Sequence, residues 1–357
     1  MKKNGIVVSF ITLIVLSLLC KSCVNSEDAA KTVFVAERAD YKEWNTVFSI
    51  STPVPLEETD SSRLTYTRQC YEYNDKIFFV DNKVKKIYCF SKDGKYLCNI
   101  GQLGHSGNEY SEIKDVSIDK STHSIVVLDY KGFVKYDTET GGFIGREDIL
   151  SETLLDIWSF VPTGQGSYLL FKIRGESSVE KYTDGVFVPI RKSKGQQYGC
   201  NHFYSTDNNT MVLGDYGDLY IDEYRDGELH RKYQLDLCGQ NLPSDMKPKD
   251  IYDMQDISSE KYFTCILSAC ETDEWLYCLL KGPENKTYHS FFNKKNDRTI
   301  VGPVDLNDGL VIVGSDNTSF KALFYPDVAD NNSYIWQKIS QTYKEFHNPV
   351  YVTLNIE

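Results

Sequence analysis

Six short apolar runs recur along this chain at a nearly constant spacing, and this repeat limits the possible folds more than any other feature. The runs are rich in β-branched and aromatic residues, and their centres lie about 43 to 52 residues apart. They are KIFFVD (76–81), SIVVLD (124–129), SYLLFK (167–172), TMVLGD (210–215), YFTCIL (262–267) and GLVIVG (309–314). A period of this length is typical of propeller blades. The repeat therefore predicts an all-β fold, a six-bladed β-propeller of four-stranded antiparallel blades.

Turn signals inside the repeats agree with this architecture. Each of the first four runs is followed by a second strand-like run, a tight turn and a third run. The turns are Asp93-Gly94, Gly141-Gly142, Asp184-Gly185 and Asp226-Gly227. Asp-Gly between alternating runs is a strong hairpin signal, because glycine accepts the positive φ of a tight turn. The fifth and sixth repeats are less regular, with NKKND (293–297) in the turn position of the fifth.

Composition also favours strands. The 357 residues include 25 Tyr and 18 Phe, and aromatic side chains fit the pleated, half-buried surface of a sheet. A β-sandwich with regular hairpins is the alternative fold, but a sandwich does not need this period six times. We expect a single propeller domain over residues 44–357.

The segment after the first hairpin, IGQLGHSGNEY (100–110), is a corner with three glycines. The following YSEIKDVSID (110–119) has the pattern of a strand, whereas a phosphate-binding loop would be followed by a helix. The glycines therefore indicate a crossing from the outer strand of one blade to the inner strand of the next, where the backbone must bend sharply.

The first repeat as a whole (76–119) resembles the blade of NHL-type β-propellers, and more closely the six-bladed propeller lipoproteins of Gram-negative anaerobes. The matching residues are Gly101, Gly104, Glu109 and Tyr110, with Ser106, Gly107 and Asn108 where that family has Gly-Pro-Gly. Asn tolerates positive φ, so the corner is expected to survive this change. The resemblance begins at STPVPLEETDSS (51–62), extends to the C-terminus and implies the same six-bladed fold.

Both ends of the domain contribute to the predicted ring. The runs TVFSI (46–50) and VYVTLNI (350–356) have strand patterns, and their pairing would close the propeller. Before the last strand, one apolar face of a short helix is formed by Ile335, Trp336, Ile339, Tyr343 and Phe346. Asn332 or Ser333 is placed to cap this helix, which we expect to cover the edge of the propeller.

The N-terminus has the pattern of an export signal. Lys2 and Lys3 precede an apolar run of 14 residues from Ile6 to Leu19, which is too short to span a bilayer comfortably. The next residues, CKSC, resemble a bacterial lipoprotein signal, in which the first mature cysteine is acylated. Small Ser22 favours Cys23 as that residue; Cys20, and an ordinary cleaved signal without lipid, remain alternatives. The predicted signal peptide is residues 1–22.

Residues 23–43 are polar, show no strand alternation and are predicted to be a flexible tether. Loss of Lys2, Lys3 and Lys21 with the signal would change the net charge from −12 to −15. Such a charge argues against nucleic acid as a partner, because phosphate binding depends on Lys and Arg. The expected location is the bacterial outer membrane or cell surface, with the N-terminal lipid as the membrane link.

Catalytic signals are sparse. The six histidines are scattered without metal-ligand spacing, and no nucleophile elbow is present. Asp81, Asp129 and Asp215 follow equivalent strands and could converge on a metal in the central channel, as in propeller lactonases and lyases. Their simpler role is to accept hydrogen bonds from turn amides. We therefore expect no catalytic, metal or cofactor-binding residues.

Two cysteine pairs follow from hairpin symmetry. A two-residue turn at Asp93-Gly94 would place Cys89 opposite Cys98, and a turn at Glu271-Thr272 would place Cys265 opposite Cys278. Disulfides are permitted in an exported protein, so Cys89–Cys98 is a predicted disulfide. A one-residue bulge would break either pairing, and buried free thiols are the alternative.

Three classes of function remain open. The first is a non-catalytic binding or scaffold module for a protein or glycan partner. The second is a metal-dependent lactonase or lyase that uses the central channel. The third is a structural subunit of an outer-membrane nutrient-import complex. Because propellers carry many activities, the fold does not choose among them. We expect the first, with recognition on loops at one face of the disc.

Overall fold

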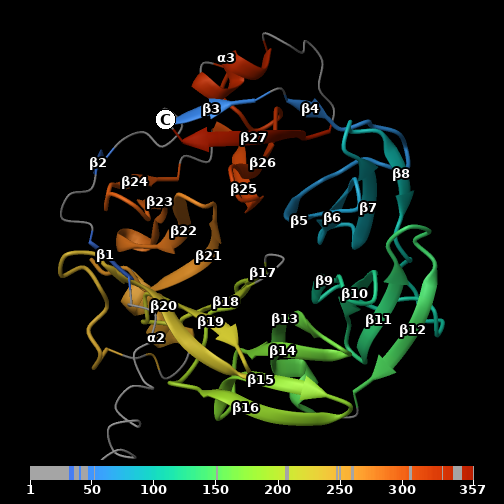
Figure 1. The fold of residues 1–357 in the computed structure, drawn as a ribbon, viewed down its shortest axis with the longest axis horizontal. Helices are drawn as coiled ribbons and strands as arrows, with labels where there is room; N and C mark the ends of the chain where they lie inside the picture. Colours follow the sequence, from blue (N-terminus) through green and yellow to red (C-terminus); the bar gives the residue numbers. More distant parts are fainter. Residues whose placement is uncertain are drawn as a thin grey trace, which may run out of the picture.

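Six β-sheets surround a central axis like the blades of a fan (Figure 1). The computed structural model describes residues 32–35, 40–41, 47–51, 53–149, 152–205, 209–246, 248, 251–258, 261–304, 308–331, 333–340 and 348–356. Four antiparallel strands form the body of each blade, in order from the axis to the rim. The predicted six-bladed propeller is confirmed.

The first three blades consist of consecutive strands only. Blade 1 contains β5 (Thr67–Tyr73), β6 (Lys76–Asp81), β7 (Lys86–Ser91) and β8 (Tyr96–Asn99). Blade 2 contains β9 (Asp115–Asp119), β10 (Ser124–Leu128), β11 (Gly132–Asp137) and β12 (Phe143–Asp148). Blade 3 contains β13 (Ile157–Gly164), β14 (Ser167–Lys172), β15 (Ser177–Thr183) and β16 (Val186–Lys192), after the 3₁₀ helix η3 (Glu152–Asp156).

The other three blades each receive a strand from the N-terminal segment. Blade 4 contains β17 (Phe203–Ser205), β18 (Thr210–Leu213), β19 (Tyr220–Arg225), β20 (Glu228–Asp236) and then β1 (Thr32–Val35). Blade 5 contains β21 (Cys265–Glu271), β22 (Trp275–Lys281), β23 (Thr287–Asn293), β24 (Thr299–Pro303) and then β2 (Asp40–Tyr41). Blade 6 contains β25 (Leu310–Ser315), β26 (Phe320–Phe324), β27 (Val350–Ile356) and β3 (Phe48–Ile50), with β4 (Val54–Pro55) also pairing with β27.

The ring closes through strands from both ends of the chain, as predicted. β3 pairs antiparallel with β27, with Ile50 opposite Leu354 and Phe48 opposite Ile356. Leu354 is fully buried. The sixth blade therefore cannot be completed by either end of the chain alone.

The predicted tether is wrong for part of residues 23–43. β1 adds to β20 and β2 adds to β24, both in parallel. Phe34 of β1 is buried between blades 4 and 5, where its ring lies 5.5 Å from Tyr233 and 5.1 Å from Phe292. Burying an aromatic side chain favours the attached segment. We call β1, β2 and β3 the rim strap, because they follow the outer edges of blades 4, 5 and 6 in turn.

The fifth and sixth repeats were assigned one strand too early. In the first four blades the predicted apolar runs are the second strands, but YFTCIL overlaps the innermost strand β21 and GLVIVG overlaps the innermost strand β25. A long connection between β20 and β21, which contains helix α2 (Ile251–Ser258), accounts for the shift. Because this connection is long, the first strands of blades 5 and 6 lie near the positions at which the repeat spacing predicts second strands.

Tight turns occur at the predicted Asp-Gly pairs. Asp184 and Gly185 both have positive φ, 48° and 83°, and they join Thr183 directly to Val186 in the ladder. Asp226 and Gly227 do the same in blade 4, with φ of 54° and 88°. These are the values that a two-residue hairpin of the right twist requires.

The corner between blades 1 and 2 depends on Gly101 more than on Asn108. Gly101 has φ of 59°, and a Cβ atom there would lie 2.5 Å from the Tyr136 ring. Asn108 does not have positive φ. Tyr110 is buried and donates a hydrogen bond to the Lys85 carbonyl at 3.1 Å, which fixes the crossing against blade 1.

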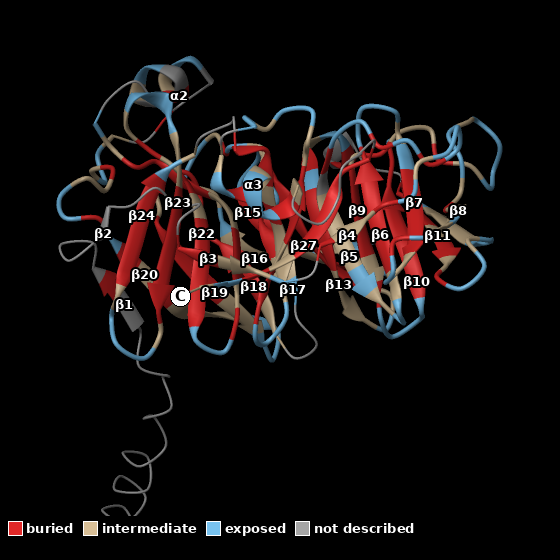
Figure 2. Cartoon of the chain, turned by 90° about the horizontal axis from the view of Figure 1, so that it is seen from above, coloured by how far each residue is buried: buried red, intermediate tan, exposed pale blue. Residues whose placement is uncertain are grey.

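Apolar residues fill the spaces between adjacent blades, and burial is deepest in the second and third strands (Figure 2). Helix α3 (Tyr334–Ser340) packs Ile335 and Ile339 into the cluster between blades 5 and 6. Its first turn is capped by Ser333, whose Oγ accepts from Trp336 N at 3.1 Å. Tyr343 and Phe346, predicted for the same face, lie outside the described residues. Among the described residues, no helix has the length and apolar character needed to cross a bilayer.

Candidate functional site

The two faces of the disc are built from different connections. On one face, which we call the entry face, the chain enters each innermost strand and turns from the second strand to the third. On the opposite face, the turn face, short hairpins join the first strand to the second and the third to the fourth. Helix α2 stands above the entry face, at the upper side of the disc in Figure 2.

Exposed large apolar side chains gather in the segments of the entry face. Those connections and strand starts carry Tyr66, Val84, Leu103, Tyr130, Leu155, Trp158, Tyr198, Tyr252, Val328 and Tyr334. The remaining exposed large apolar residues of the described chain belong to outermost strands: Leu97, Phe143, Ile144, Val186 and Val188, of which Phe143 and Val186 are the first residues of their strands, next to hairpins of the turn face. The described hairpins of the turn face contribute none. A concentration of this kind is typical of an interaction site.

Four residues of the entry-face set lie in the connections and strand starts of blades 2 to 4, and we call them the aromatic surface: Tyr130, Leu155, Trp158 and Tyr198. Lys114 connects its first two members. The Lys114 ammonium lies 5.8 Å from the centre of the Tyr130 ring and donates to the carbonyls of Leu154 at 2.7 Å and Leu155 at 3.3 Å. Burial lowers the pKa of Lys114 to about 8. This lysine holds the end of η3 against blade 2.

Trp158 is held at the start of β13 by a glycine. A Cβ atom on Gly199 would lie 2.7 Å from the indole ring, so the ring packs directly on the backbone beside Tyr198. The Trp158 side chain nevertheless remains 45% exposed. Asp156 braces the same region, because its carboxylate pairs with Arg174 at 2.9 Å and its carbonyl accepts from Ile173 N at 3.0 Å. The indole is therefore presented by a fixed backbone.

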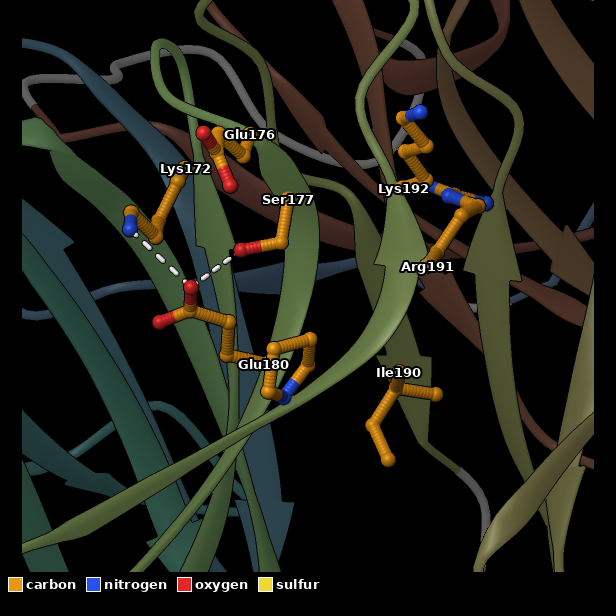
Figure 3. A pocket seen from close by; sticks show the side chains of 8 residues that line it. Lys172, Glu176, Ser177, Glu180, Ile190, Arg191 and Lys192 are labelled. Atoms are coloured by element: carbon orange, nitrogen blue, oxygen red, sulfur yellow. Dashed lines mark hydrogen bonds and ion pairs between the residues drawn. The ribbon is translucent and has the colours of Figure 1, made fainter.

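A pocket of about 540 Å³ opens at the entry-face end of blade 3, where β14 ends, β15 begins and β16 ends (Figure 3). It is lined by Lys172, Glu176, Ser177, Glu180, Pro189, Ile190, Arg191 and Lys192. Lys172 and Glu180 are 6% and 7% exposed, and Lys172 Nζ lies 3.0 Å from Glu180 Oε1. Ser177 donates to the same oxygen. We call this the blade-3 pocket.

The three strand-end aspartates do not converge on the channel. Asp81 accepts from Thr65 N at 2.6 Å and Lys83 N at 3.0 Å, so it ties the entry segment to a turn. Asp129 accepts from Lys131 N at 2.7 Å. Asp215 pairs with Arg191 of the preceding blade at 2.8 Å. The geometry of these three aspartates therefore does not support a metal site.

The histidines are also placed structurally. His202 stacks on Phe171 with ring centres 3.3 Å apart, and His289 contacts the Tyr277 hydroxyl at 2.9 Å. Burial lowers the pKa of both imidazoles to about 3. Within the described part of the chain, no three His, Cys, Asp or Glu side chains are grouped as a metal site would need.

One pairing was not anticipated from spacing. Cys200 Sγ lies 3.1 Å from His202 Nδ1, a contact that brings a thiol to an imidazole near the inner end of blade 4. Burial raises the pKa of the Cys200 thiol well above its usual value while lowering that of His202. A catalytic cysteine needs the opposite shifts. These directions do not favour a thiolate nucleophile at this position.

The predicted cysteine pairs have different outcomes. Cys89 does lie opposite Cys98 in the ladder, and both are free thiols in the structure. Cys265 does not lie opposite Cys278, since Cys278 faces Ala269 and Cys265 faces Lys281. The turn comes two residues later than predicted, and Leu267 forms a bulge that shifts the register again.

Inner strands of blades 1 to 3 are joined at the channel by Asp115. Its carboxylate accepts from Gln69 Nε2 at 2.5 Å and from Phe160 N at 2.8 Å. Burial raises the pKa of Asp115 to about 7. This carboxyl group fixes three blades relative to one another, and so fixes the loops above them.

The predicted lipidation residue Cys23, the alternative Cys20 and the signal peptide all lie outside the described residues. The aromatic surface and the blade-3 pocket were missed by sequence reasoning. Exposed aromatics resemble core aromatics in a sequence, and only the topology shows which connections share a face. Leu155-Asp156-Ile157-Trp158, with large apolar residues on both sides of the start of β13, was the available signal.

Comparisons with known proteins place this geometry in context. The family model described as "Domain of unknown function (DUF4934)" matches residues 43–353. No curated protein matches significantly. A protein of Bacteroides fragilis NCTC 9343 whose name describes it as exported superposes with a TM-score of 0.77 and 16% identity, over 91% of this chain and 100% of that one.

Two further solved structures are more distant. A DUF4221 family member from Bacteroides vulgatus ATCC 8482 has a TM-score of 0.53 and 10% identity, over 88% of this chain and 99% of that one. A gluconolactonase from Xanthomonas campestris has a TM-score of 0.42 and 12% identity, over 87% and 99% of the two chains. The first supports the fold alone, and the second is too distant to carry an argument about activity.

Proposed function

This chain belongs to the DUF4934 family, and we propose that it is a non-catalytic binding module of the bacterial cell envelope. The observation that carries the proposal is the difference between the faces of the disc. The entry face presents the aromatic surface and further exposed apolar residues in its connections, whereas on the turn face the exposed large apolar residues next to the described hairpins are the strand-start residues Phe143 and Val186. Exposed apolar patches on a soluble fold mark sites of contact with another molecule.

The rest of the fold supplies rigidity to this face. The ring is closed by β3 and β27, and Asp115 joins the inner strands of three blades. Recognition residues are commonly carried on loops that a rigid scaffold positions. The Gly199 contact and the Arg174–Asp156 ion pair serve this purpose for Trp158 and Leu155.

We further propose that acylated Cys23 holds the module at the outer membrane or cell surface. The support is the basic and apolar N-terminal run that ends in CKSC. The partner is a protein or a glycan. With a mature charge of −15, a protein partner is expected to offer a basic or neutral face, and association should slow as salt rises.

Site-specific photo-crosslinking tests the binding face. A photoreactive residue at position 155, on the aromatic surface, should capture a discrete partner in cells that produce the full chain. The same residue at position 186, on the rim, is the matched control, because Val186 is equally exposed but lies in β16. Equal capture from both positions, capture only from position 186, or none from position 155 would overturn the proposal.

The non-catalytic part has its own test. The purified chain is expected to contain no stoichiometric divalent metal and to hydrolyse no member of a lactone and ester panel above background. One metal per chain whose removal abolishes a measurable turnover would instead establish a metal-dependent hydrolase.

A further inference from the structure

The blade-3 pocket contains polar groups whose bonding capacity the protein does not use. Lys172 and Ser177 both donate to Glu180 Oε1. Glu180 Oε2 receives no hydrogen bond from any described residue and is not sealed from the pocket. The ammonium of Lys172 has three donors and uses one of them on a described residue. The remaining N–H donors of Lys172 and the Oε2 acceptor of Glu180 can therefore bind a polar ligand.

Charge limits what that ligand can be. Lys172 and Lys192 are balanced by Glu176 and Glu180. Arg191 adds no free charge, since its guanidinium turns toward blade 4, where it lies 2.8 Å from Asp215 and donates to the Leu213 carbonyl at 2.8 Å. The pocket therefore has little net charge with which to attract a phosphate or a carboxylate.

Hydroxyl groups fit these atoms better than charged groups do. One hydroxyl can accept from Lys172 Nζ and donate to Glu180 Oε2 at the same time, and the ion pair stays intact. A charged ligand group would have to replace one partner of a pair that is more than nine-tenths buried, which is strongly unfavourable. Adjacent hydroxyls would extend the same pattern to Ser177, Glu176 and Lys192.

We propose that the blade-3 pocket binds a neutral saccharide. Pro189 and Ile190 also line the pocket and offer apolar surface to the C–H groups of a sugar. The pocket volume of about 540 Å³ is within the range of small-ligand sites, roughly 300 to 1,000 Å³. This inference rests on the proposed binding function and names its ligand class.

Calorimetric titration of the full chain in mild detergent tests the proposal. The probes are maltose, cellobiose, lactose and N-acetyllactosamine, with glucuronic acid, inorganic phosphate and glycine betaine as charged comparisons. At least one neutral sugar should bind, and Glu180→Gln should weaken it tenfold or more by replacing the acceptor Oε2. Lys192→Met, at an exposed position of the pocket lining, should weaken it as well. Glu274→Gln, on the turn face, is the matched control and should leave binding unchanged.

Thermal unfolding of each variant separates lost binding from lost folding, and Lys192→Met provides the test if Glu180→Gln is unstable. The inference is overturned if no neutral sugar binds at 10 mM, if only the charged probes bind, or if both variants bind as the wild type does. Position-155 crosslinking to a protein, with no sugar bound, would overturn the saccharide inference while leaving the proposed binding function intact.

Discussion

Cys89 of β7 faces Cys98 of β8 across the two outer strands of blade 1. Hydrogen bonding between the two thiols lowers the pKa of Cys98 and raises that of Cys89. Cys98 is partly exposed, whereas Cys89 is buried. The pair therefore contains one thiol whose ionisation is favoured and a second thiol beside it.

We predict that oxidised glutathione converts this pair to an intrachain disulfide, with the two thiols losing two electrons and two protons. Closing the short loop should add about 2 to 3 kcal/mol to the free energy of unfolding. Peptide mapping without reduction would identify the linked peptides. Cys278→Ser should leave the cross-link unaffected, while an oxidised chain that still carries two alkylatable thiols at these positions would refute the prediction.

Stability should fall as pH rises through the titration of Asp115. Its pKa of about 7 in the folded chain is above the unfolded value of roughly 3.9, so its favourable contribution is complete below that lower value and is lost as pH approaches 7. This difference in pKa corresponds to a contribution of at most about 4 kcal/mol to the free energy of unfolding. Urea unfolding between pH 4 and 8 would measure this slope, and Asp115→Asn should flatten it. An unchanged slope in the variant would contradict the assigned origin.

Phe34→Ala should destabilise the domain by roughly 3 kcal/mol, because it leaves a cavity between Tyr233 and Phe292. Val188→Ala, on an exposed position of β16, serves as the control and should cost well under 1 kcal/mol. Chemical denaturation of both variants checks this. If the Phe34 variant is as stable as the control, β1 contributes no more than a tether would.

Cys23→Ala should release the protein from membranes or leave the precursor uncleaved, whereas Cys20→Ala should leave fractionation unchanged. Acyl transfer requires the cysteine thiol, so the substitution removes the attachment atom itself. Metabolic labelling with a fatty-acid analogue measures the modification directly. The opposite pattern would identify Cys20 as the acylated residue. A wild-type chain that takes up no label would indicate a signal without lipid.

The blade architecture could be predicted because its turns are encoded locally. Asp184-Gly185 and Asp226-Gly227 adopt positive φ at both positions, and few residue pairs other than these tolerate that geometry. Cys89 and Cys98 were paired correctly for a partly wrong reason. The loop has three residues, Lys92 to Gly94, and a bulge at Leu97 restores the register that a two-residue turn would have produced.

Long-range pairing was not predictable in the same way. The first two strands of the rim strap were missed because β1 and β2 are too short to show alternation, and their stability comes from contacts about 200 residues or more away along the chain. The β-branched and aromatic run Thr32–Val35 was the one local sign. Likewise, Cys265 and Cys278 were mispaired because neither the turn position nor the bulge at Leu267 has a sequence signal.

The rim strap also decides how the molecule would respond to mechanical force. A pull on the N-terminus reaches β1 first, then β2, and only afterwards β3, whose removal opens the ring. Force would therefore be dissipated in separate steps at the periphery before the blades are loaded. If the chain is held by its N-terminus, β1, β2 and β3 would detach one after another under load, and the blades that carry the entry face would stay folded until β3 is lost.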